Sequence, residues 1–511
     1  MPTQFNHKVQ NSTRRAFLAS AISAPALLRA GGSRRPNILL AVADDQSWVH
    51  TSAAGDKVVR TPGFDQVCST GVHFTNAICC SPGCAPSRAA ILTGRYPWQL
   101  EEAGTHASLF PRKLTVYPDL LAKAGYFVGL TGKGAGPCNF KTPGWPHNPA
   151  GPAFDNHSAI NPPKGVGKED YAANFEGFLK ACGKGQPFCF WFGSHEPHRT
   201  YDRGIGARSG KKPEDVVVPP FLPDSLEVRN DILDYFFEIE YFDRQLARML
   251  DTLAKEGELE NTIVVVTADN GMSFPASKAM MHEYGIHMPL AIAWPAAAKG
   301  GRVSDDLVSF VDFAATFLDA AGVPTPKDLE GRSLTPALTA GKPHGRPFVL
   351  SGRERHSHAR FDLLGYPVRA LRTGRHLYVR NFAPDRWPAG DPPGYFDIDN
   401  GPTKEWMMAQ RHASTVQKYF EAGFGKKPEE ELFDIQADPG CMKNLGGEAG
   451  LQKVLGGLRK DLETRLREQG DPRVTGKGDI WESYPRFSPT RPELGGFSKE
   501  GEYNPKYKPG K

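Results

Sequence analysis

The stretch PNILLAVADD, residues 36–45, decides the fold that this sequence predicts. It is apolar for most of its length and ends in two neighbouring carboxylates, Asp44 and Asp45. Short, uninterrupted apolar runs are typical of strands buried on both faces, as in the parallel sheets of α/β proteins. We therefore expect an α/β protein in which this strand delivers acidic side chains to one end of a central sheet.

Similar apolar runs alternate with helical patterns through the first two thirds of the chain. Within 225–255 the apolar residues largely recur every three or four positions, as on one face of an amphipathic helix. This alternation of strands and helices is typical of α/β architecture. Strands are expected at 126–130, 187–192, 262–267 and 288–294, and helices at 116–124 and 225–255.

A second, smaller α+β region is expected from about Pro343. Residues 368–372 and 376–380 have the pattern of a β-hairpin, and 451–466 that of an amphipathic helix. Residues 431–435 are expected to form a further strand. We expect a catalytic domain at 36–342, a C-terminal subdomain at 343–470 and a C-terminal tail at 471–511.

The N-terminus has the pattern of a signal peptide at residues 1–30. This segment contains no acidic residue, and Arg14-Arg15 precedes a short apolar run rich in Ala and Ser. The run is too short to span a bilayer, which needs about 20 apolar residues. The twin-arginine type of signal is indicated, which predicts a periplasmic or secreted mature protein without a membrane span. A disordered tail and an uncleaved anchor are the alternatives.

The composition excludes several classes of protein. The 511 residues include 62 Lys and Arg against 57 Asp and Glu, and the resulting net charge of +5 is too weak to indicate a nucleic-acid partner. Eight cysteines are too few for a disulfide scaffold in a chain of this length. A globular protein of two to four domains remains, with no nucleic-acid partner.

Polar clusters follow three of the expected strands. Asp44-Asp45, His195-Glu196-Pro197-His198 and Asp269-Asn270 each come directly after an apolar run. In open α/β sheets, ligands bind outside the carboxyl ends of the strands. Carboxylate and amide oxygens suit Ca²⁺ or Mg²⁺, although Asp and Asn are also ordinary turn residues. Three such clusters together predict a site for a divalent cation.

Two lysines occupy comparable positions. Lys133 follows the strand expected at 126–130, and Lys278 lies shortly after Asn270. Cations that face a divalent metal indicate an anionic substrate of the sulfate or phosphate type. A solvated surface position is the ordinary alternative for either lysine.

Four cysteines, Cys68, Cys79, Cys80 and Cys84, lie close together in the sequence. The spacing does not fit a zinc site, and a disulfide is the simpler alternative in an exported protein. The context of Cys84 favours another interpretation. Cys84-Ala85-Pro86-Ser87-Arg88, extended by Leu92-Thr93-Gly94, resembles the signature of the formylglycine-dependent type I sulfatases.

The resemblance extends over most of residues 36–470. It implies an alkaline-phosphatase-like α/β fold, with a large central mixed sheet flanked by helices and a C-terminal subdomain that contains a short antiparallel sheet. It also implies that a separate maturation enzyme oxidises Cys84 to formylglycine, and that the metal is Ca²⁺ rather than Mg²⁺. The implied metal ligands are Asp44, Asp45, Cys84 in its modified form, Asp269 and Asn270.

The resemblance also implies catalytic roles. Arg88 corresponds to the arginine that holds the formylglycine, and Lys133 and Lys278 to lysines that contact the sulfate. His195 corresponds to the histidine that faces the leaving group. The family commonly has Lys-x-His at Lys133, whereas this chain has Ala135 at the position of that histidine. Either another histidine substitutes, with His106 as a candidate, or this branch works without one.

The substrate expected from the resemblance is a sulfated saccharide. The segments 194–199, 215–223, 267–278, 331–338 and 365–372 resemble the heparan N-sulfatase branch. They imply a glycosaminoglycan-like substrate with an N-sulfoglucosamine or an O-sulfated sugar. The residues expected to contact it are His198, Arg199, Arg355 and His356.

Three hypotheses for the function follow. The first is a sulfatase that hydrolyses a sulfate ester or sulfamate of such a saccharide. The second is a phosphomonoester or phosphonate hydrolase of the same fold, some of which also use formylglycine. The third is a noncatalytic, Ca²⁺-dependent glycan-binding protein.

Overall fold

Strand β1 (Asn37–Ala43) forms where the first apolar run predicts it, and all of its residues are buried. It pairs in parallel with β4 (Phe188–Gly193) on one side and with β5 (Thr262–Ala268) on the other. Strand β3 (Phe127–Gly132) continues the parallel part of the sheet beyond β4. Each of these strands was predicted to within about two residues, because a strand with neighbours on both edges and both faces is apolar throughout.

This computed structural model describes residues 34–357, 359–360, 364–484, 497–499 and 502–503. The predicted signal peptide at 1–30 lies outside the described residues. From residue 35 onward, the described residues form one compact unit. None of the helices in the described part of the chain is long and apolar enough to cross a membrane.

The rest of the large sheet is mixed, as expected. β7 (Leu290–Ala293) is antiparallel to β5, and β2 (Val72–Ile78) is antiparallel to β7, so β2 runs in the same direction as β1. β6 (His287–Met288) pairs with β2 in antiparallel fashion, and β8 (Arg302–Ser309) pairs with it in parallel. The strand order is β3-β4-β1-β5-β7-β2-β6, with β8 beside β2.

The strand expected at 288–294 is divided in two. β6 ends at Met288 and β7 begins at Leu290, so Pro289 separates them. Proline has no backbone N–H and cannot donate to a sheet ladder, which explains the interruption.

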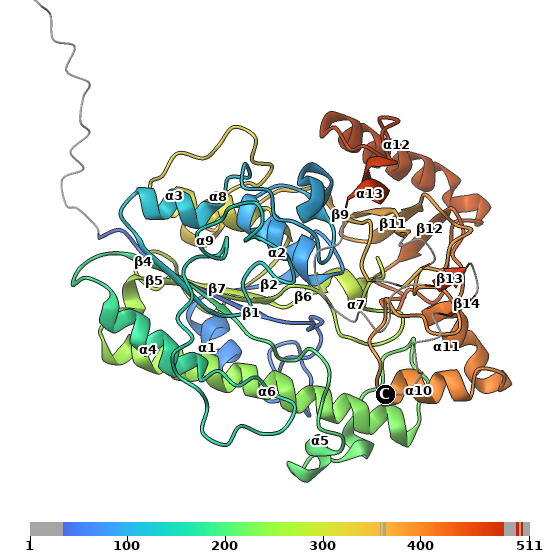
Figure 1. Cartoon of the computed structure of the whole chain (residues 1–511), viewed down its shortest axis with the longest axis horizontal. Coiled ribbons are helices and arrows are strands. Elements are labelled where there is room, and N and C mark those ends of the chain that lie inside the picture. The colour runs from blue at the N-terminus through green and yellow to red at the C-terminus, as the bar shows by residue number, and fades with distance from the viewer. Residues whose placement is uncertain (1–33, 358, 361–363, 485–496, 500–501, 504–511) are drawn as a thin grey trace, which may run out of the picture. The chain divides into compact units, whose positions relative to one another are not determined.

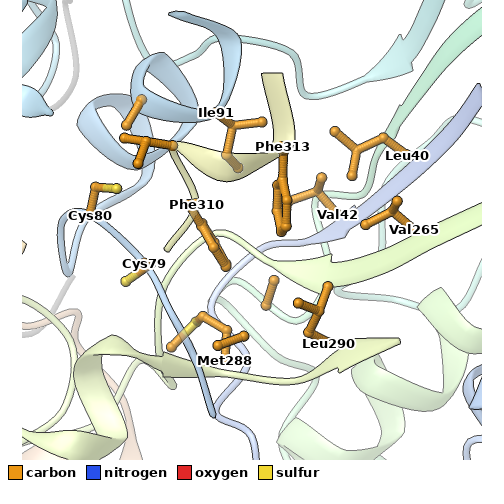
Figure 2. Close-up of a cluster of buried hydrophobic side chains, with 14 of the residues drawn as sticks. Leu40, Val42, Cys79, Cys80, Ile91, Val265, Met288, Leu290, Phe310 and Phe313 are labelled. Carbon is orange, nitrogen blue, oxygen red and sulfur yellow. The ribbon is translucent and has the colours of Figure 1, made fainter. Parts of the chain in front are cut away.

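Helices cover both faces of this sheet (Figure 1). One face carries α2 (Cys84–Thr93), α3 (Tyr117–Lys123), α8 (Asp312–Ala320) and α9 (Thr335–Ala340), and the other α1 (Pro62–Thr70), α4 (Tyr171–Ala181) and α6 (Leu226–Lys255). Figure 2 shows Leu40 and Val42 of β1 and Val265 of β5 in one cluster with Phe310, which precedes α8, and Phe313 in its first turn. Apolar side chains therefore pack on both faces of the sheet, and polar side chains can gather only at the ends of the strands.

The C-terminal part contains the expected small antiparallel sheet. Its order is β12 (Glu430–Asp434), β11 (His376–Asn381), β10 (Val368–Arg372) and β9 (Val349–Arg353), and every pair is antiparallel. The hairpin β10–β11 was predicted, as was helix α12 (Gln452–Glu468). The remaining helices and strands are α5 (Ile205–Arg208), α7 (Glu283–Ile286), α10 (Pro402–Ala409), α11 (Ser414–Phe424), α13 (Ile480–Ser483), β13 (Phe497–Lys499) and β14 (Glu502–Tyr503).

The first residues of the predicted tail pack into the C-terminal part. Asp471 is fully buried and its carboxylate binds the buried guanidinium of Arg369 on β10, at 2.7 Å and 3.0 Å. Trp481 on α13 is 1% exposed. The domain boundaries near 343 and 471 stay predictions.

Candidate active site

The parallel strands bring the polar clusters to one edge of the sheet. Asp44 and Asp45 follow β1, Lys133 follows β3, His195 follows β4, and Asp269 and Asn270 follow β5. β2 runs in the same direction, so the loop after it also starts at this edge and leads to Cys84 at the beginning of α2. Parallel strands of one sheet present their carboxyl ends together, which is why residues so distant in sequence meet here.

A buried acidic cluster forms the floor of the site. Asp44, Asp45 and Asp269 each place a carboxylate oxygen within 4.8 Å of the others, and none of the three is more than 1% exposed. Asn270 donates from Nδ2 to Asp45 Oδ1 at 2.7 Å. Within the described residues, Asp44 Oδ1 and Asn270 Oδ1 are buried without a hydrogen-bond donor. Buried oxygens of this kind are costly unless something positive binds them, so the donor set fits a hard divalent cation.

Three cationic side chains balance these carboxylates. Lys133 Nζ donates to Asp44, and Lys278 Nζ donates to Asp45 Oδ2 at 2.6 Å. Arg88 donates from Nε to Asp269 Oδ2 at 2.6 Å and from Nη1 to the carbonyl oxygen of Lys133 at 2.7 Å. Burial alone would lower the pKa of Lys278, but Asp399 and Asp45 outweigh it and hold that pKa well above its usual value. Lys278 therefore stays charged inside the protein.

The carboxylates respond differently to this environment. Burial raises the pKa of Asp269 to about 6 against the opposing effect of Arg88. Burial also acts to raise the pKa of Asp44, but Lys133, His198 and Arg88 together hold it well below its usual value. The balance between burial and neighbouring cations thus decides which carboxylates are ionised here.

Cys84 is the first residue of α2, and it is 1% exposed. Arg88 follows four residues later on the same helix, so both side chains lie on one face. Burial, reinforced by Asp44, raises the pKa of the Cys84 thiol well above its usual value. A Cβ at position 83 would lie 2.8 Å from His356 Nδ1, so any larger residue there would force this imidazole to move. All eight cysteines of the chain are free, so the disulfide alternative is wrong.

A cavity of about 430 Å³ opens above this floor. His195 is exposed toward it, and partial desolvation together with Lys133 lowers the pKa of His195. His198 Nδ1 lies 2.6 Å from the carbonyl oxygen of Arg199, and its Nε2 lies 3.8 Å from Asp45 Oδ2. The cavity is lined by Asp44, Lys133, Gly136, Pro137, Gly165, Val166, Gly167, His195, His198 and Arg199.

Other residues predicted to contact substrate lie near the site but bind the scaffold. The guanidinium of Arg199 forms a bidentate ion pair with Asp231 of α6, at 2.7 Å and 2.8 Å. Arg355 donates from Nη2 to Ser108 Oγ at 3.2 Å and to the carbonyl oxygen of Tyr484 at 2.6 Å. Both arginines join distant segments of the chain around the site.

Two histidines lie on the Gly83 side of Cys84. His356 is 6% exposed, and its imidazole ring packs against the Cα of Gly83. The ring centroids of His106 and His356 are 4.6 Å apart. Ala135 is fully buried, and its backbone N–H donates to Asn148 Oδ1 at 3.1 Å. His106 thus lies in a histidine pair close to the start of α2.

The sequence did not point to Asp399, and it placed Glu196 in a polar cluster without a role of its own. Asp399 comes from the irregular segment before α10, and its Oδ2 accepts from Lys278 Nζ at 2.8 Å. Glu196 is buried and accepts hydrogen bonds from Tyr171 OH at 3.1 Å and from the backbone N–H of Gly167 at 2.5 Å. The cis Glu196-Pro197 peptide bond follows it. An acidic residue in a loop has no periodic signal, so neither role was visible before the fold was known.

Comparison with known proteins agrees with this arrangement. A family model described as Sulfatase matches residues 36–323. Human N-sulphoglucosamine sulphohydrolase is 27% identical over 509 residues, which cover 90% of this chain and 96% of the human protein. An ulvan-active sulfatase of Formosa agariphila is 28% identical over 468 residues, which cover 86% of this chain and 76% of that protein.

Solved structures share the fold. A protein determined in complex with its substrate D-glucosamine-2-N,6-O-disulfate superposes with a TM-score of 0.63, at 22% identity, over 86% of this chain and 98% of that chain. This likeness confirms the expected alkaline-phosphatase-like fold with a smaller C-terminal antiparallel sheet. The family model covers more than half of the chain and begins at the first strand of the sheet, and the chain therefore belongs to the sulfatase family.

Proposed function

We propose that this protein hydrolyses a sulfate ester or sulfamate of a sulfated, glycosaminoglycan-like saccharide. The observation that carries the proposal is the placement of Cys84, Arg88, Lys133 and Lys278 around one buried acidic cluster at the floor of a cavity. A sulfuryl group is a compact anion, and fixed cations in a desolvated site stabilise the charge on its oxygens. The names of the similar proteins, which include a sulphohydrolase of N-sulphoglucosamine, support the substrate class.

We propose that Asp44, Asp45, Asp269 and Asn270 hold Ca²⁺ together with residue 84. The two buried oxygens on Asp44 and Asn270 and the all-oxygen donor set of these four side chains support this assignment. When bound, the ion supplies positive charge that stabilises the sulfuryl oxygens and lowers the pKa of a hydroxyl group at position 84.

We propose that a maturation enzyme converts Cys84 to formylglycine. The buried thiol with its raised pKa is a poor nucleophile, because the thiolate is the reactive form. As a hydrated aldehyde, residue 84 supplies one hydroxyl group to attack sulfur and a second to expel sulfate.

The remaining residues act by charge and by proton transfer. Arg88 fixes the start of α2 against Asp269 and the backbone of Lys133, and thereby orients residue 84. The ammonium groups of Lys133 and Lys278 stabilise the negative charge on the sulfuryl oxygens. His195 is exposed toward the cavity and is proposed to donate a proton to the departing oxygen or nitrogen of the sugar. Its lowered pKa predicts that this step is faster under mildly acidic conditions.

The release of sulfate requires a proton acceptor. His106 stays our candidate, because its ring packs against His356, which contacts the residue before Cys84. Export by the twin-arginine route stays a proposal that rests on Arg14-Arg15 in the sequence.

The test is to express the chain with and without a formylglycine-generating enzyme. Mass spectrometry of the peptide that carries Cys84 reports the modification, and a panel of N-sulfated and O-sulfated glucosamines and 4-nitrophenyl phosphate reports the reaction. We expect sulfate release only from the modified protein with Ca²⁺. Turnover of the phosphate ester alone would favour the phosphohydrolase alternative, and binding without turnover would favour the glycan-binding one.

A further inference from the structure

Asp399 places a carboxylate from the C-terminal part of the chain into the site. Its Oδ2 lies 2.8 Å from Lys278 Nζ, and one carboxylate oxygen lies within 4.8 Å of ligand atoms on Asp45 and His198. The side chain of Asp399 is 11% exposed and that of His198 is 30% exposed. Asp399 therefore lies beside the buried floor and next to His198, which lines the cavity.

The segment around Asp399 is held in place from both sides. Lys404 Nζ donates to the carbonyl oxygen of Ile398 at 2.8 Å, and the backbone N–H of Thr403 donates to Asp231 Oδ2 at 3.1 Å. A Cβ at Gly401 would lie 2.3 Å from Arg199 Nη1, so the backbone packs directly on that guanidinium. Asp399 is thus a preorganised group and not a mobile surface residue.

A fixed carboxylate is unexpected next to a pocket that takes an anion. At short range it repels a sulfate, so it works against substrate binding unless another part of the substrate compensates. An ionised carboxylate only accepts hydrogen bonds, and it can accept several at once. Lys278 supplies one donor, and the same group can accept a further one from a ligand.

We propose that Asp399 is a specificity-determining residue that accepts a hydrogen bond from a hydroxyl or ammonium group next to the scissile sulfate of the sugar. This inference rests on the proposed sulfatase function and deepens it. The preferred substrate carries a donor at the neighbouring position. A second sulfate there is rejected, because it brings negative charge against Asp399 and removes the donor.

Kinetic comparison of Asp399→Asn with the parent enzyme tests this role. The substrates are 4-nitrophenyl sulfate, which has no neighbouring hydroxyl group, and a monosulfated glucosamine. We expect kcat/KM for the sugar to fall about 10- to 100-fold, because the hydrogen bond to a charged group is lost. We expect kcat/KM for the aryl sulfate, which has no such hydrogen bond to lose, to change less than about 3-fold. Asp385→Asn, which alters an exposed aspartate before the same segment, is the matched control and should change neither substrate.

The outcomes separate the possible roles. Equal losses on both substrates would overturn the inference, because Asp399 would then act only through Lys278. Unchanged kinetics on both would also overturn it. If Asp399→Asn does not fold, Asp399→Ser is measured in the same way, and the parent enzyme is compared on mono- and disulfated glucosamine. Equal rates on those two sugars refute the inference without any variant, whereas a parent enzyme that cleaves no sulfated compound refutes the proposed function itself.

Discussion

Replacing Lys278 by Met should separate its structural from its catalytic contribution. Lys278 Nζ binds Asp45 Oδ2 at 2.6 Å and Asp399 Oδ2 at 2.8 Å, and its side chain is only 2% exposed. Removing one partner of a buried ion pair leaves the other charge unpaired and costs about 3–5 kcal/mol. With an unfolding entropy of about 2.1 cal/mol/K per residue, this lowers the Tm of the 511-residue chain by roughly 3–5 °C.

The loss of kcat in Lys278→Met should correspond to more than the loss of stability explains. It should persist in a second variant whose stability is partly restored. Removing one preorganised charge from a site of this kind lowers kcat by about 10²- to 10³-fold. In the double variant Lys278→Met/Asp399→Asn, the carboxylate at 399 is gone but Asp45 still lacks its ammonium partner, so only part of the lost Tm should return while kcat stays low. Thermal unfolding followed by circular dichroism and turnover of an aryl sulfate measure the two effects.

Two results would refute this reasoning. A double variant that is no more stable than Lys278→Met would show that the Asp399 carboxylate does not contribute to the cost. A Lys278→Met enzyme with the parent kcat would show that this ammonium group does not act on the sulfuryl group. Lys443→Met, at a lysine whose side chain is 72% exposed, is the control and should change stability by less than about 0.5 kcal/mol.

Three further predictions follow from single side chains. Cys84→Ala should abolish turnover but leave the Tm in Ca²⁺ within a few degrees, and undiminished activity would overturn the proposed nucleophile. Asp269→Ala should abolish turnover and the rise in Tm on adding Ca²⁺, which a titration in a chelator-treated sample measures. Glu238 on α6 is buried, neither of its carboxylate oxygens has a hydrogen-bond partner among the described residues, and burial, followed by Glu196, raises its pKa from 4.5 to about 9. The folded chain therefore holds a proton that the unfolded chain releases, and stability falls as pH rises between those values, by up to about 1.4 kcal/mol per pH unit. Glu238→Gln should flatten this part of the Tm–pH curve, and an unchanged slope would contradict the assignment.

The sequence predicted the parallel half of the large sheet and the residues at its strand ends. β1, β3, β4 and β5 are apolar because neighbours surround them, so their signal is strong, and polar residues placed directly after them must meet at one edge. β2 was not predicted, because His73, Thr75 and Asn76 interrupt its apolar pattern, and these residues are only partly buried. The strand that leads to Cys84 is therefore visible only in the structure.

The parts of the site that come from loops could not be predicted. Asp399 is an ordinary charged residue in a segment without periodicity, and Arg199 was expected to contact substrate rather than Asp231. Only the tertiary packing decides that Asp399 binds Lys278 and that Arg199 binds Asp231. The same holds for Asp471, which lies in a stretch expected to be a surface tail and instead binds the buried Arg369. Long-range ion pairs of this kind leave no trace in local sequence patterns.

The lysines of the site bind carboxylates that are also the proposed metal ligands. Lys133 donates to Asp44 and Lys278 to Asp45, so each ammonium group neutralises an acid that would otherwise be buried and unpaired. A carboxylate cannot give its full charge to an ammonium group and a divalent cation at once, and the two cations repel each other at short range. Loading of the site should therefore weaken both lysine contacts and make the ammonium groups available to an anionic substrate. Lys278 also forms an ion pair with a second carboxylate, that of Asp399. Among the described residues, Lys133 forms an ion pair only with Asp44.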